Sequence, residues 1–590
     1  MNLLEKNIQA LLSGVNEPLG NKLLNFIQNK TCSRFNIDEN LNIYDKTHNV
    51  FMYENLEEEL NFFYQGILEK TPRYPFICIY GIGNALLIKN LAKHYKHLFV
   101  FESEIELFIL ALSTIDLSEE LKVYKVVLFD CVAKDLEIQI AMIFDQQSIL
   151  EYLSLYEMFI SSHYYLKYYE TSILSLNELC IKSASVAIRN ADITCFLPLL
   201  THGQFLQNIP SMLESIPFQR ILNERKNKFE NAIVVSAGPS LAKQLPLLKA
   251  CQDKAVIFCA DGALSMLEKE GIVPDYVTNL DFTDLAMKFF QNKENKTSLN
   301  ILSCATHPNV AHSLKAENCM IVLRNKALYQ RFNFNDFGYI DTGTHVSHFS
   351  YTLALALGFK NIIMIGQDLA FDEEGNSHSK GFDFGEKFSG EENIDKLKIP
   401  AYAGKGEVLT HTTWNDYRIK LEYLFACNDQ KAKFYNATEG GARINFTEEL
   451  SFKECCEKLL TKEKPKFELP KSLTKNRSDK LLVKFKEKIQ KDQENAKRFL
   501  DDALALKQIL ENILSKDFIL PLEFLEKVYQ NIENFNHSLD EDEFIQDEVL
   551  RGAFAYRGKM IADVLKLHIK DETHFITAYI KAYHEWLLYF

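Results

Sequence analysis

Polar residues follow three short apolar runs in the middle of the chain, and their types suit the binding of a nucleotide-like ligand. The runs Ala232–Val235 and Ala255–Cys259 are β-rich, and each precedes a helix-like segment, which is typical of buried parallel strands and their crossovers. The polar residues that follow these runs and the next one are Gly238, Pro239, Ser240, Asp261, Gly262, Asn279 and Asp281. Since open α/β sheets bind ligands outside the carboxyl ends of their strands, we expect these residues to converge on one crevice.

The turn after the first run has the residue types of an anion site. Gly238 has no Cβ, so its backbone can approach a phosphate or a ribose closely. Pro239 and Ser240 open a helix whose free N–H groups favour an anion. Asp261 and Asn279 can bind ribose or base hydroxyls and amines. A nucleotide-type ligand therefore suits this set of groups.

Strands and helices continue to alternate from Ala232 to about Leu450, which predicts a doubly wound α/β domain. The polar residues at or near the further strand ends of this domain are His307, Arg324, His345, Gln367, Asp368, Asn436, Glu439 and Gly440. Phe371–Thr412 is a long polar stretch with many glycines, and we interpret it as a lid over the crevice.

An N-terminal α/β region precedes this domain. The strand Phe76–Tyr80 is followed by the turn Gly81–Leu86 and, about 20 positions later, by Glu102, the spacing of a ribose-binding carboxylate. Because Leu86 replaces the third glycine of that motif, a packing turn in a Rossmann-like domain is favoured over an occupied cofactor site. Glu137–Phe144 is interpreted as a further strand.

The remaining sequence predicts a helical region, since glycines nearly disappear after residue 450 and Leu, Phe, Lys and Glu recur at helical spacing. The expected domains are an N-terminal Rossmann-like domain over 1–220, a central domain over 221–450 and a helical domain over 451–590. Asp540-Glu541-Asp542 has the form of a metal-binding DxD motif, but it lies between helices without a preceding strand, so a solvated turn is favoured and no metal site is expected.

Composition restricts the partners and the compartment. The net charge of −14 argues against a general nucleic-acid binder. Twelve cysteines without CxxC spacing indicate free thiols in a reducing compartment. The N-terminus does not resemble a secretory signal, and no apolar run reaches the roughly 20 residues that a membrane span needs. We therefore expect a cytoplasmic protein without a transmembrane segment.

Several segments of the central region resemble one known family. The segments are VVSAGPSL, FCADGALSML, GIVPDYVTNLDF, HVSHFSYTLALALGFKNIIMIGQDLAF and NATEGGARI. In this order they resemble the motility-associated factor (Maf) family of bacterial flagellin glycosyltransferases, whose central domain is similar to bacterial sialyltransferases. The resemblance implies transfer of a nonulosonic acid, pseudaminic or legionaminic acid, from its CMP-activated form to Ser or Thr hydroxyls of flagellin. It implies flagellin as partner and no metal or other cofactor.

This reaction assigns expected roles to the residues above. The expected donor-binding residues are Gly238, Pro239, Ser240, Asp261, Asn279, Arg324, Gln367, Asn436, Glu439 and Gly440. Arg324 is the first candidate for the cation that pairs with the donor carboxylate, because its planar fork offers two N–H groups. A hydroxyl acceptor needs a general base and an oxocarbenium centre needs negative charge, for which the candidates are Asp281, His307, His345 and Asp368.

Two alternatives stay open at this point. The same central motifs resemble hydroxymethylpterin pyrophosphokinase-like enzymes, which would move a pyrophosphoryl group from ATP to a pterin with Mg²⁺. The chain could instead be a non-catalytic flagellin-binding assembly factor. Asp261, Asp281 and Asp368 favour an enzyme, because a decayed pocket would be expected to lack such carboxylates.

Overall fold

The computed structural model describes residues 2–14, 16–191, 195–290, 298–388, 395–516, 520–540, 542 and 548–589. Contacts divide the chain into two compact units. The first is made of Met1–Cys195, Phe499–Glu541 and Leu550–Phe590, and the second of Phe196–Arg498 and Asp542–Val549. These two units are groups of segments that pack together, and they do not test boundaries along the sequence. The predicted domain boundaries at residues 220 and 450 therefore stay predictions. Glu541 of the DxD triplet lies outside the described residues.

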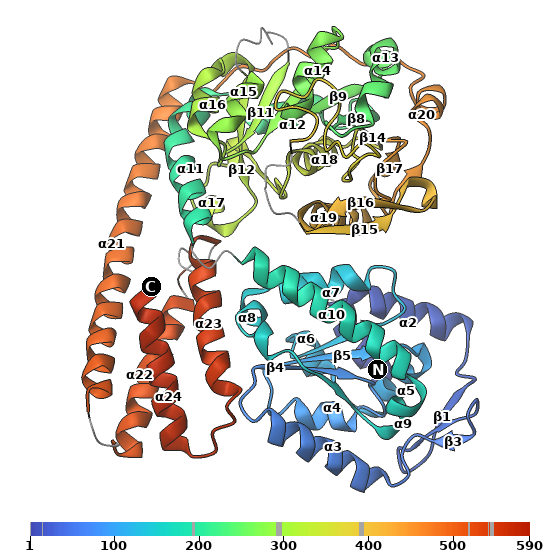
Figure 1. The fold of residues 1–590 in the computed structure, drawn as a ribbon, viewed down its shortest axis with the longest axis vertical. Helices are drawn as coiled ribbons and strands as arrows, with labels where there is room; N and C mark the ends of the chain where they lie inside the picture. The colour runs from blue at the N-terminus through green and yellow to red at the C-terminus, as the bar shows by residue number, and fades with distance from the viewer. Residues whose placement is uncertain are drawn as a thin grey trace. The chain divides into compact units, whose positions relative to one another are not determined.

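The first unit is built on a four-stranded parallel sheet in the order β6-β5-β4-β7 (Figure 1). Its strands are β4 (Phe76–Tyr80), β5 (His97–Glu102), β6 (Val126–Asp130) and β7 (Met158–Ile160). Of these four strands, β4 comes first in the chain, and it lies between β5 and β7 in the sheet. This strand order is that of half a Rossmann fold. The predicted Rossmann-like character is therefore confirmed.

Helices and a small antiparallel sheet complete the first unit. The small sheet contains β1 (Phe35–Ile37), β2 (Ile43–Asp45) and β3 (Val50–Phe51). The N-terminal helices are α1 (Leu3–Leu12), α2 (Glu17–Asn29), α3 (Leu56–Lys70), α4 (Leu86–Leu91), α5 (Ile105–Thr114), α6 (Ser118–Lys122), α7 (Leu136–Phe144), α8 (Gln147–Leu150), α9 (His163–Tyr168) and α10 (Glu170–Asn190). The predicted strand Glu137–Phe144 is wrong, because this apolar run forms helix α7 and packs against α10.

The C-terminal region is helical, as predicted. Its helices are α20 (Phe452–Leu459), α21 (Lys475–Leu514), α22 (Leu522–Asp540), α23 (Arg551–Leu565) and α24 (Glu572–Tyr589). A buried ion pair joins α23 to the segment after α8, with 3.1 Å between Arg557 Nη2 and Glu151 Oε2. The Trp586 indole N–H of α24 donates to the Ala553 carbonyl at 2.8 Å. These contacts explain why α23 and α24 belong to the same unit as the N-terminal sheet.

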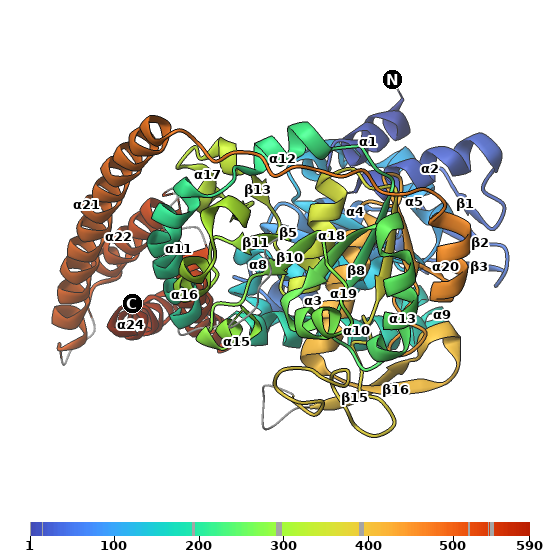
Figure 2. The same cartoon turned by 90° about the horizontal axis from the view of Figure 1, so that it is seen from above.

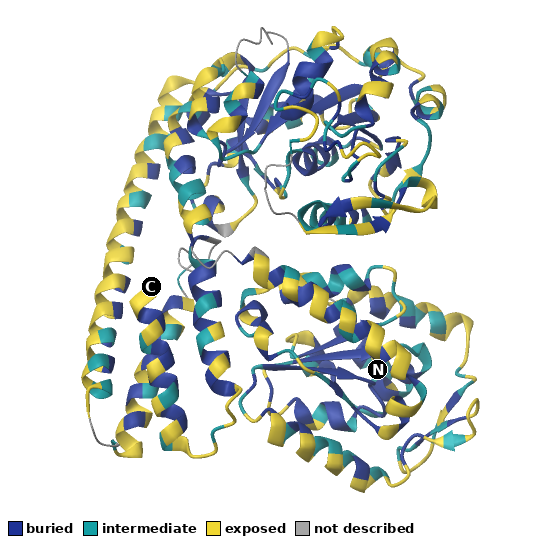
Figure 3. Ribbon diagram, viewed as in Figure 1, coloured by how far each residue is buried: buried dark blue, intermediate teal, exposed yellow. Residues whose placement is uncertain are grey.

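The second unit contains a nine-stranded sheet whose neighbouring strands are all parallel. Its order is β13-β12-β11-β10-β9-β8-β14-β17-β18. The strands are β8 (Asn231–Val235), β9 (Val256–Ala260), β10 (Tyr276–Asn279), β11 (Leu299–Ser303), β12 (Cys319–Arg324), β13 (Tyr339–Ile340), β14 (Asn361–Ile365), β17 (Lys433–Asn436) and β18 (Glu448–Glu449). Figure 3 shows these strands as mostly buried.

Helices cover both faces of this sheet, which confirms the doubly wound α/β class. The helices are α11 (Phe196–Glu214), α12 (Phe218–Arg225), α13 (Leu241–Cys251), α14 (Leu264–Lys269), α15 (Met287–Phe290), α16 (Pro308–Ser313), α17 (Ala327–Gln330), α18 (Val346–Ala356), α19 (Thr412–Ala426) and α20. One apolar core lies between the sheet and α12, α18 and α19. The other lies between the sheet and α13, α14 and α20.

The stretch Phe371–Thr412 has more regular structure than the sequence predicts. β15 (Lys396–Pro400) and β16 (Glu407–His411) form an antiparallel hairpin, which lies at the lower edge of Figure 2. The alternation in Lys396-Leu397-Lys398-Ile399 explains the strand. The part before the hairpin packs near the strand ends, since the Ser379 N–H donates to the Ala237 carbonyl at 2.9 Å.

Candidate functional site

The sheet of the second unit reverses its strand order between β8 and β14. From β8 the chain builds outward through β9 to β13, and it then returns to place β14 on the other side of β8. The connections leave in opposite directions at such a point, so a crevice opens at the carboxyl ends of the two strands. A cavity of about 120 Å³ lies there. It is lined by Ser236, Ala237, Gly238, Gly366, Gln367, Asp368, Leu369, Ala370, Ser377, His378 and Trp414.

The Asp368 carboxyl lies against the turn after β8. Its Oδ2 accepts the Ser240 hydroxyl at 2.8 Å, and the Ser240 backbone N–H lies 3.3 Å from both carboxyl oxygens. Pro239 is half-buried and lies between Gly238 and Ser240, the two residues of this turn that contact the carboxyl. A Cβ on Gly238 would lie only 2.9 Å from Asp368 Cγ and 2.5 Å from the Gly366 carbonyl oxygen. The carboxyl of Asp368 thus explains why position 238 is glycine.

The expectation of free N–H groups for an anion at this turn is wrong. The N–H of Ser240 is directed at Asp368, and the Ala242 N–H donates to Ser379 Oγ at 3.0 Å. The Gly238 N–H donates to a backbone carbonyl of the turn after β14 at 2.8 Å. The chain therefore supplies its own carboxylate where the helix N-terminus favours negative charge.

Burial sets the protonation of this carboxyl. Burial raises the pKa of Asp368 to about 6, and the hydrogen bonds from Ser240 oppose that rise. Gly441 approaches from the turn after β17, where a Cβ would lie 2.7 Å from the Asp368 carbonyl carbon. The neighbouring Gly440 would place its Cβ 3.5 Å from Asp368 Oδ1. Asp368 is therefore enclosed by three strand-end turns and can exchange a proton near neutral pH.

Gln367 is held rigidly beside Asp368. Its Oε1 accepts the Ser236 hydroxyl at 2.9 Å and the Tyr351 hydroxyl at 3.3 Å. Tyr351 belongs to α18, and Ser236 follows β8. The amide thus ties the two sides of the switch point together through groups that are buried.

Aromatic side chains form another wall of the cavity. The Trp414 ring lies 4.1 Å from the ring of His411 and 4.9 Å from that of Phe371. His378 stacks on Phe382 with ring centroids 3.9 Å apart. Burial lowers the pKa of both His378 and His411 to about 4, so both are neutral near neutral pH. Sequence reasoning missed His411 because its segment was expected to be a loop, and its end-of-strand position was the only available signal.

Two further histidines lie where α18 begins. His345 caps the helix, because its Nδ1 accepts the His348 N–H at 2.9 Å. Its ring lies 4.7 Å from that of Tyr417 on α19, one helical turn from Trp414. Burial lowers the pKa of His345 well below its usual value and that of His348 to about 4. The predicted His345 thus lies near the cavity wall without lining the cavity.

Asp261 and Asn279 form a second polar pair at the ends of β9 and β10. Asn279 Nδ2 donates to Asp261 Oδ2 at 2.5 Å, and the Gly262 N–H donates to Asp261 Oδ1 at 2.7 Å. Both side chains are buried, and Asn279 Oδ1 has no hydrogen-bond partner among the residues that the structure describes. A buried amide oxygen of this kind can accept a ligand N–H or O–H.

The other predicted residues lie farther along the same edge. Asp281 Oδ1 accepts both the N–H and the hydroxyl of Thr283, and the His307 N–H donates to the Asp281 carbonyl at 2.9 Å. His307 also caps α16. Arg324 ends β12, which is four strands from β8 and hence about 19 Å away at a strand spacing of about 4.8 Å. The predicted groups therefore form a row along the edge rather than one cluster.

The turn after β17 combines architectural and polar groups. Glu439 is exposed and its Oε2 accepts the first N–H of α20, from Phe452, at 3.0 Å. Asn436 is buried, and its Oδ1 accepts the Thr438 N–H at 3.2 Å. Within the described part of the chain, its Nδ2 has no hydrogen-bond partner. Gly440 approaches Asp368, as described above. The predicted Asn436, Glu439 and Gly440 thus border the switch point, and Glu439 is directed at α20.

The glycine turn of the first unit is filled by protein groups. Glu102 Oε2 accepts the Tyr165 hydroxyl at 2.5 Å and the Ile82 N–H at 3.1 Å. Burial raises the pKa of Glu102 to about 7. A Cβ on Gly81 would meet the Tyr165 ring and lie 2.6 Å from Ser161 Oγ. These contacts agree with a packing turn.

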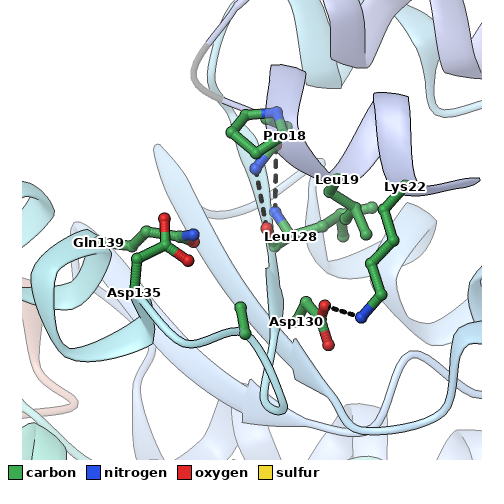
Figure 4. Close-up of a pocket in the computed structure, with 9 residues that line it drawn as sticks. Pro18, Leu19, Lys22, Leu128, Asp130, Asp135 and Gln139 are labelled. Carbon is green, nitrogen blue, oxygen red and sulfur yellow. Dashed lines mark hydrogen bonds and ion pairs between the residues drawn. The ribbon is translucent and has the colours of Figure 1, made fainter. Parts of the chain in front are cut away.

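A second cavity, of about 210 Å³, lies between α2, β6 and α7 in the first unit (Figure 4). Lys22 forms an ion pair with Asp130 at its side. Asn16 donates to the Leu128 carbonyl at 2.8 Å and accepts the Leu128 N–H at 3.3 Å, which closes the edge of β6. Lys22, Asp130 and Asn16 of this lining thus have partners within the chain.

Within the described ranges, no group of three or more His, Cys, Asp or Glu side chains could hold a metal ion. Among the helices that the structure describes, none is long and apolar enough to cross a membrane.

Comparison with known proteins gives two findings. Residues 203–374, which include β8 to β14, match the family described as 6-hydroxymethylpterin diphosphokinase MptE-like. The chain is also similar to the solved structure of the MAf glycosyltransferase from Magnetospirillum magneticum AMB-1, with 16% sequence identity and a TM-score of 0.48, over 99% of this chain and 96% of that chain. No curated protein matches the chain.

Proposed function

We propose that the protein is a glycosyltransferase that moves a nonulosonic acid, pseudaminic or legionaminic acid, from its CMP-activated donor to Ser or Thr hydroxyls of flagellin. One observation carries this proposal: two of the family-like segments, AGPSL and IGQDLAF, meet in the switch-point cavity although 128 positions separate Ser240 from Asp368. At a TM-score of 0.48 the likeness in fold carries no weight here. The proposal rests on the motifs and on the chemistry of the cavity.

In this proposal the donor lies along the carboxyl edge of the sheet. The unpartnered Asn279 Oδ1 accepts a hydrogen bond from the nucleoside, beside the buried Asp261. Arg324 has no role in this proposal, because the donor carboxylate and phosphate are both bonded to the reacting carbon, and five strand positions separate β12 from β14 and the proposed base Asp368. A nucleotide with an attached sugar is an extended ligand, and it suits a row of polar groups better than a more compact ligand would.

Asp368 is the proposed proton acceptor. A Ser or Thr hydroxyl is protonated at neutral pH, so transfer needs a base whose pKa lies near the working pH. The pKa of Asp368, raised to about 6, meets this condition. The three other candidates, Asp281, His307 and His345, stay predictions. When Asp368 is ionised, its charge also stabilises a nearby oxocarbenium centre. No metal or cofactor takes part in this proposal.

The test is an incubation of the full chain with flagellin and CMP-pseudaminic acid, and separately with CMP-legionaminic acid, followed by intact mass measurement of flagellin. We expect a mass increase of one sugar or more with one donor, unchanged by EDTA. Flagellin that binds the chain but gains no mass with either donor would instead favour the assembly-factor reading.

The family match to residues 203–374 favours a second candidate, pyrophosphoryl transfer from ATP to a hydroxymethylpterin. That reaction needs Mg²⁺. The two candidates separate in one assay, because EDTA abolishes pterin diphosphate formation and leaves sugar transfer intact.

A further inference from the structure

Two cysteines of the second unit lie next to each other on two packed helices. Cys251 is the last residue of α13 and is buried, and Cys456 lies in α20 and is half-buried. Their sulfur atoms are 3.5 Å apart, although 205 positions separate the residues. A disulfide needs about 2.05 Å, so the sulfur atoms must approach by about 1.5 Å, which side-chain rotation can supply.

The surroundings make the two thiols chemically unequal. The Cys456 thiol donates a hydrogen bond to Cys251 Sγ. This bond and the nearby charge of Lys254 lower the pKa of Cys251, and burial opposes them. The same bond, together with burial, raises the pKa of Cys456. Cys251 is therefore the better nucleophile of the pair, and Cys456 is placed to resolve an oxidised Cys251.

We propose that Cys251 and Cys456 form a reversible disulfide when the protein meets a small peroxide. The Cys251 thiolate attacks one peroxide oxygen and becomes a sulfenic acid, and the hydroxide that leaves is protonated to water. Cys456 then loses its proton, attacks the Cys251 sulfur and displaces the hydroxyl as a second water. Two thiols are oxidised to one disulfide, and hydrogen peroxide is reduced to two waters.

The disulfide would connect two helices whose first turns contact the strand-end turns at the switch point. α13 begins beside Ser240, which contacts Asp368, and its Gln244 donates to the Thr438 carbonyl at 3.2 Å. α20 begins at Phe452, whose N–H is capped by Glu439. Oxidation thus joins the last residue of α13 to the middle of α20, while the first turns of both helices contact the strand-end turns near the cavity. This inference goes beyond the proposed function, because the disulfide forms whichever group the site transfers.

The test uses the reduced full chain, which is treated with hydrogen peroxide. The chain is then unfolded in denaturant that contains N-ethylmaleimide, which alkylates the free thiols. We expect two of the twelve cysteines to escape alkylation, and a linked peptide that contains residues 251 and 456. Dithiothreitol should restore both thiols. The adjacent Cys455 supplies a matched control: the link should be lost in Cys456→Ala and retained in Cys455→Ala.

A second measurement tests the effect on the helices. Amide exchange in α13 and α20 should slow in the oxidised chain relative to the reduced chain. Alkylation of all twelve cysteines after peroxide, a sulfinic acid at Cys251 without a link, or a link that persists in Cys456→Ala would overturn the proposal. If Cys455→Ala does not fold, backbone fragmentation between residues 455 and 456 in the wild-type linked peptide assigns the partner.

Discussion

The carboxyl group of Asp368 occupies the space that a side chain on Gly238 would need. An added Cβ would lie 2.9 Å from Asp368 Cγ, and the gap is closed on its other side by the Gly366 carbonyl oxygen at 2.5 Å. The glycine after β8 and the acid after β14 thus form one structural feature.

Gly238→Ala should displace the Asp368 carboxyl and reduce transfer severely. The backbone on both sides of the new methyl group cannot move freely, so we expect a loss of about 1–3 kcal/mol in the free energy of unfolding. Gly203→Ala in α11 is the matched control, since apart from its chain neighbours and the nearby backbone of its own helix, no atom of the described residues lies within 4 Å of its added Cβ. In this control the free energy of unfolding should rise by about 0.5–1 kcal/mol, and the rate of sugar transfer should stay that of the wild type. Urea unfolding and sugar-transfer rates of the two variants test this prediction. Equal stabilities and equal rates in Gly238→Ala and Gly203→Ala would contradict the close contact between position 238 and Asp368.

Asp368→Asn should change the pH dependence of stability. The folded pKa of about 6 lies above the ordinary value of 3.8, so the protonated form favours folding and its stabilisation is lost as the pH rises through about 6. Asn has no such loss. The free energy of unfolding of Asp368→Asn relative to wild type should therefore rise by about 2 kcal/mol from about pH 4 to pH 8. A pH-independent difference in urea unfolding would mean that the carboxyl titrates normally.

The same substitution tests the role of Asp368 in transfer. If Asp368 accepts the proton, the wild-type rate rises with pH through about 6 as the carboxyl ionises. Asp368→Asn should lose this limb and most of the rate. A variant that keeps the wild-type rate and profile would move the base to another group, with His345 the next candidate.

Gln367→Leu should leave two buried hydroxyl groups without an acceptor, since Gln367 Oε1 accepts from Ser236 and Tyr351. We expect a loss of about 1–3 kcal/mol in the free energy of unfolding. In a Ser236→Ala background the same change should cost less, because one donor is already absent. A double-mutant cycle measures this coupling, and additive effects would show that the Ser236 bond contributes nothing.

His348→Leu should make the chain less sensitive to acid. Burial lowers the pKa of His348 from 6.5 to about 4. The contribution of the neutral imidazole to the free energy of unfolding is therefore present above about pH 6.5 and is lost as the pH falls towards 4. The wild-type chain should lose about 2 kcal/mol more than the variant between about pH 7 and pH 5. Urea midpoints at the two pH values decide this. Parallel losses in both proteins would assign the acid sensitivity to other groups.

Much of the second unit could be predicted from the sequence, because its short β-rich runs end in glycine and acidic residues. β8, β9 and β14 lie where the apolar runs place them, with Gly238, Asp261 and Asp368 at or just beyond their ends. The run Glu137–Phe144 shows the limit of this reasoning. An apolar run of that length suits a strand or a buried helix equally, and the packing of α7 against α10 decides between them.

The order of the strands could not be predicted, and the order decides which residues meet. Arg324 and Asp368 both follow inner strands, yet five strand positions separate β12 from β14. The contact between Ser240 and Asp368 spans 128 positions, and no local pattern contains it. The occupied helix N-terminus at Ser240 is likewise a tertiary effect, because the competing carboxylate comes from another strand.

Trp414 offers the most direct test of the central claim that the switch-point cavity binds the donor nucleotide. It is one of two tryptophans and lines the cavity, whereas Trp586 lies in α24 of the first unit. Titration with CMP-pseudaminic acid, and separately with CMP-legionaminic acid, should change the tryptophan fluorescence of the wild-type chain saturably with one donor, and the change should be absent in Trp414→Phe. A wild-type chain that shows no change, or a Trp414→Phe variant that shows the full change, would contradict the placement of the donor site.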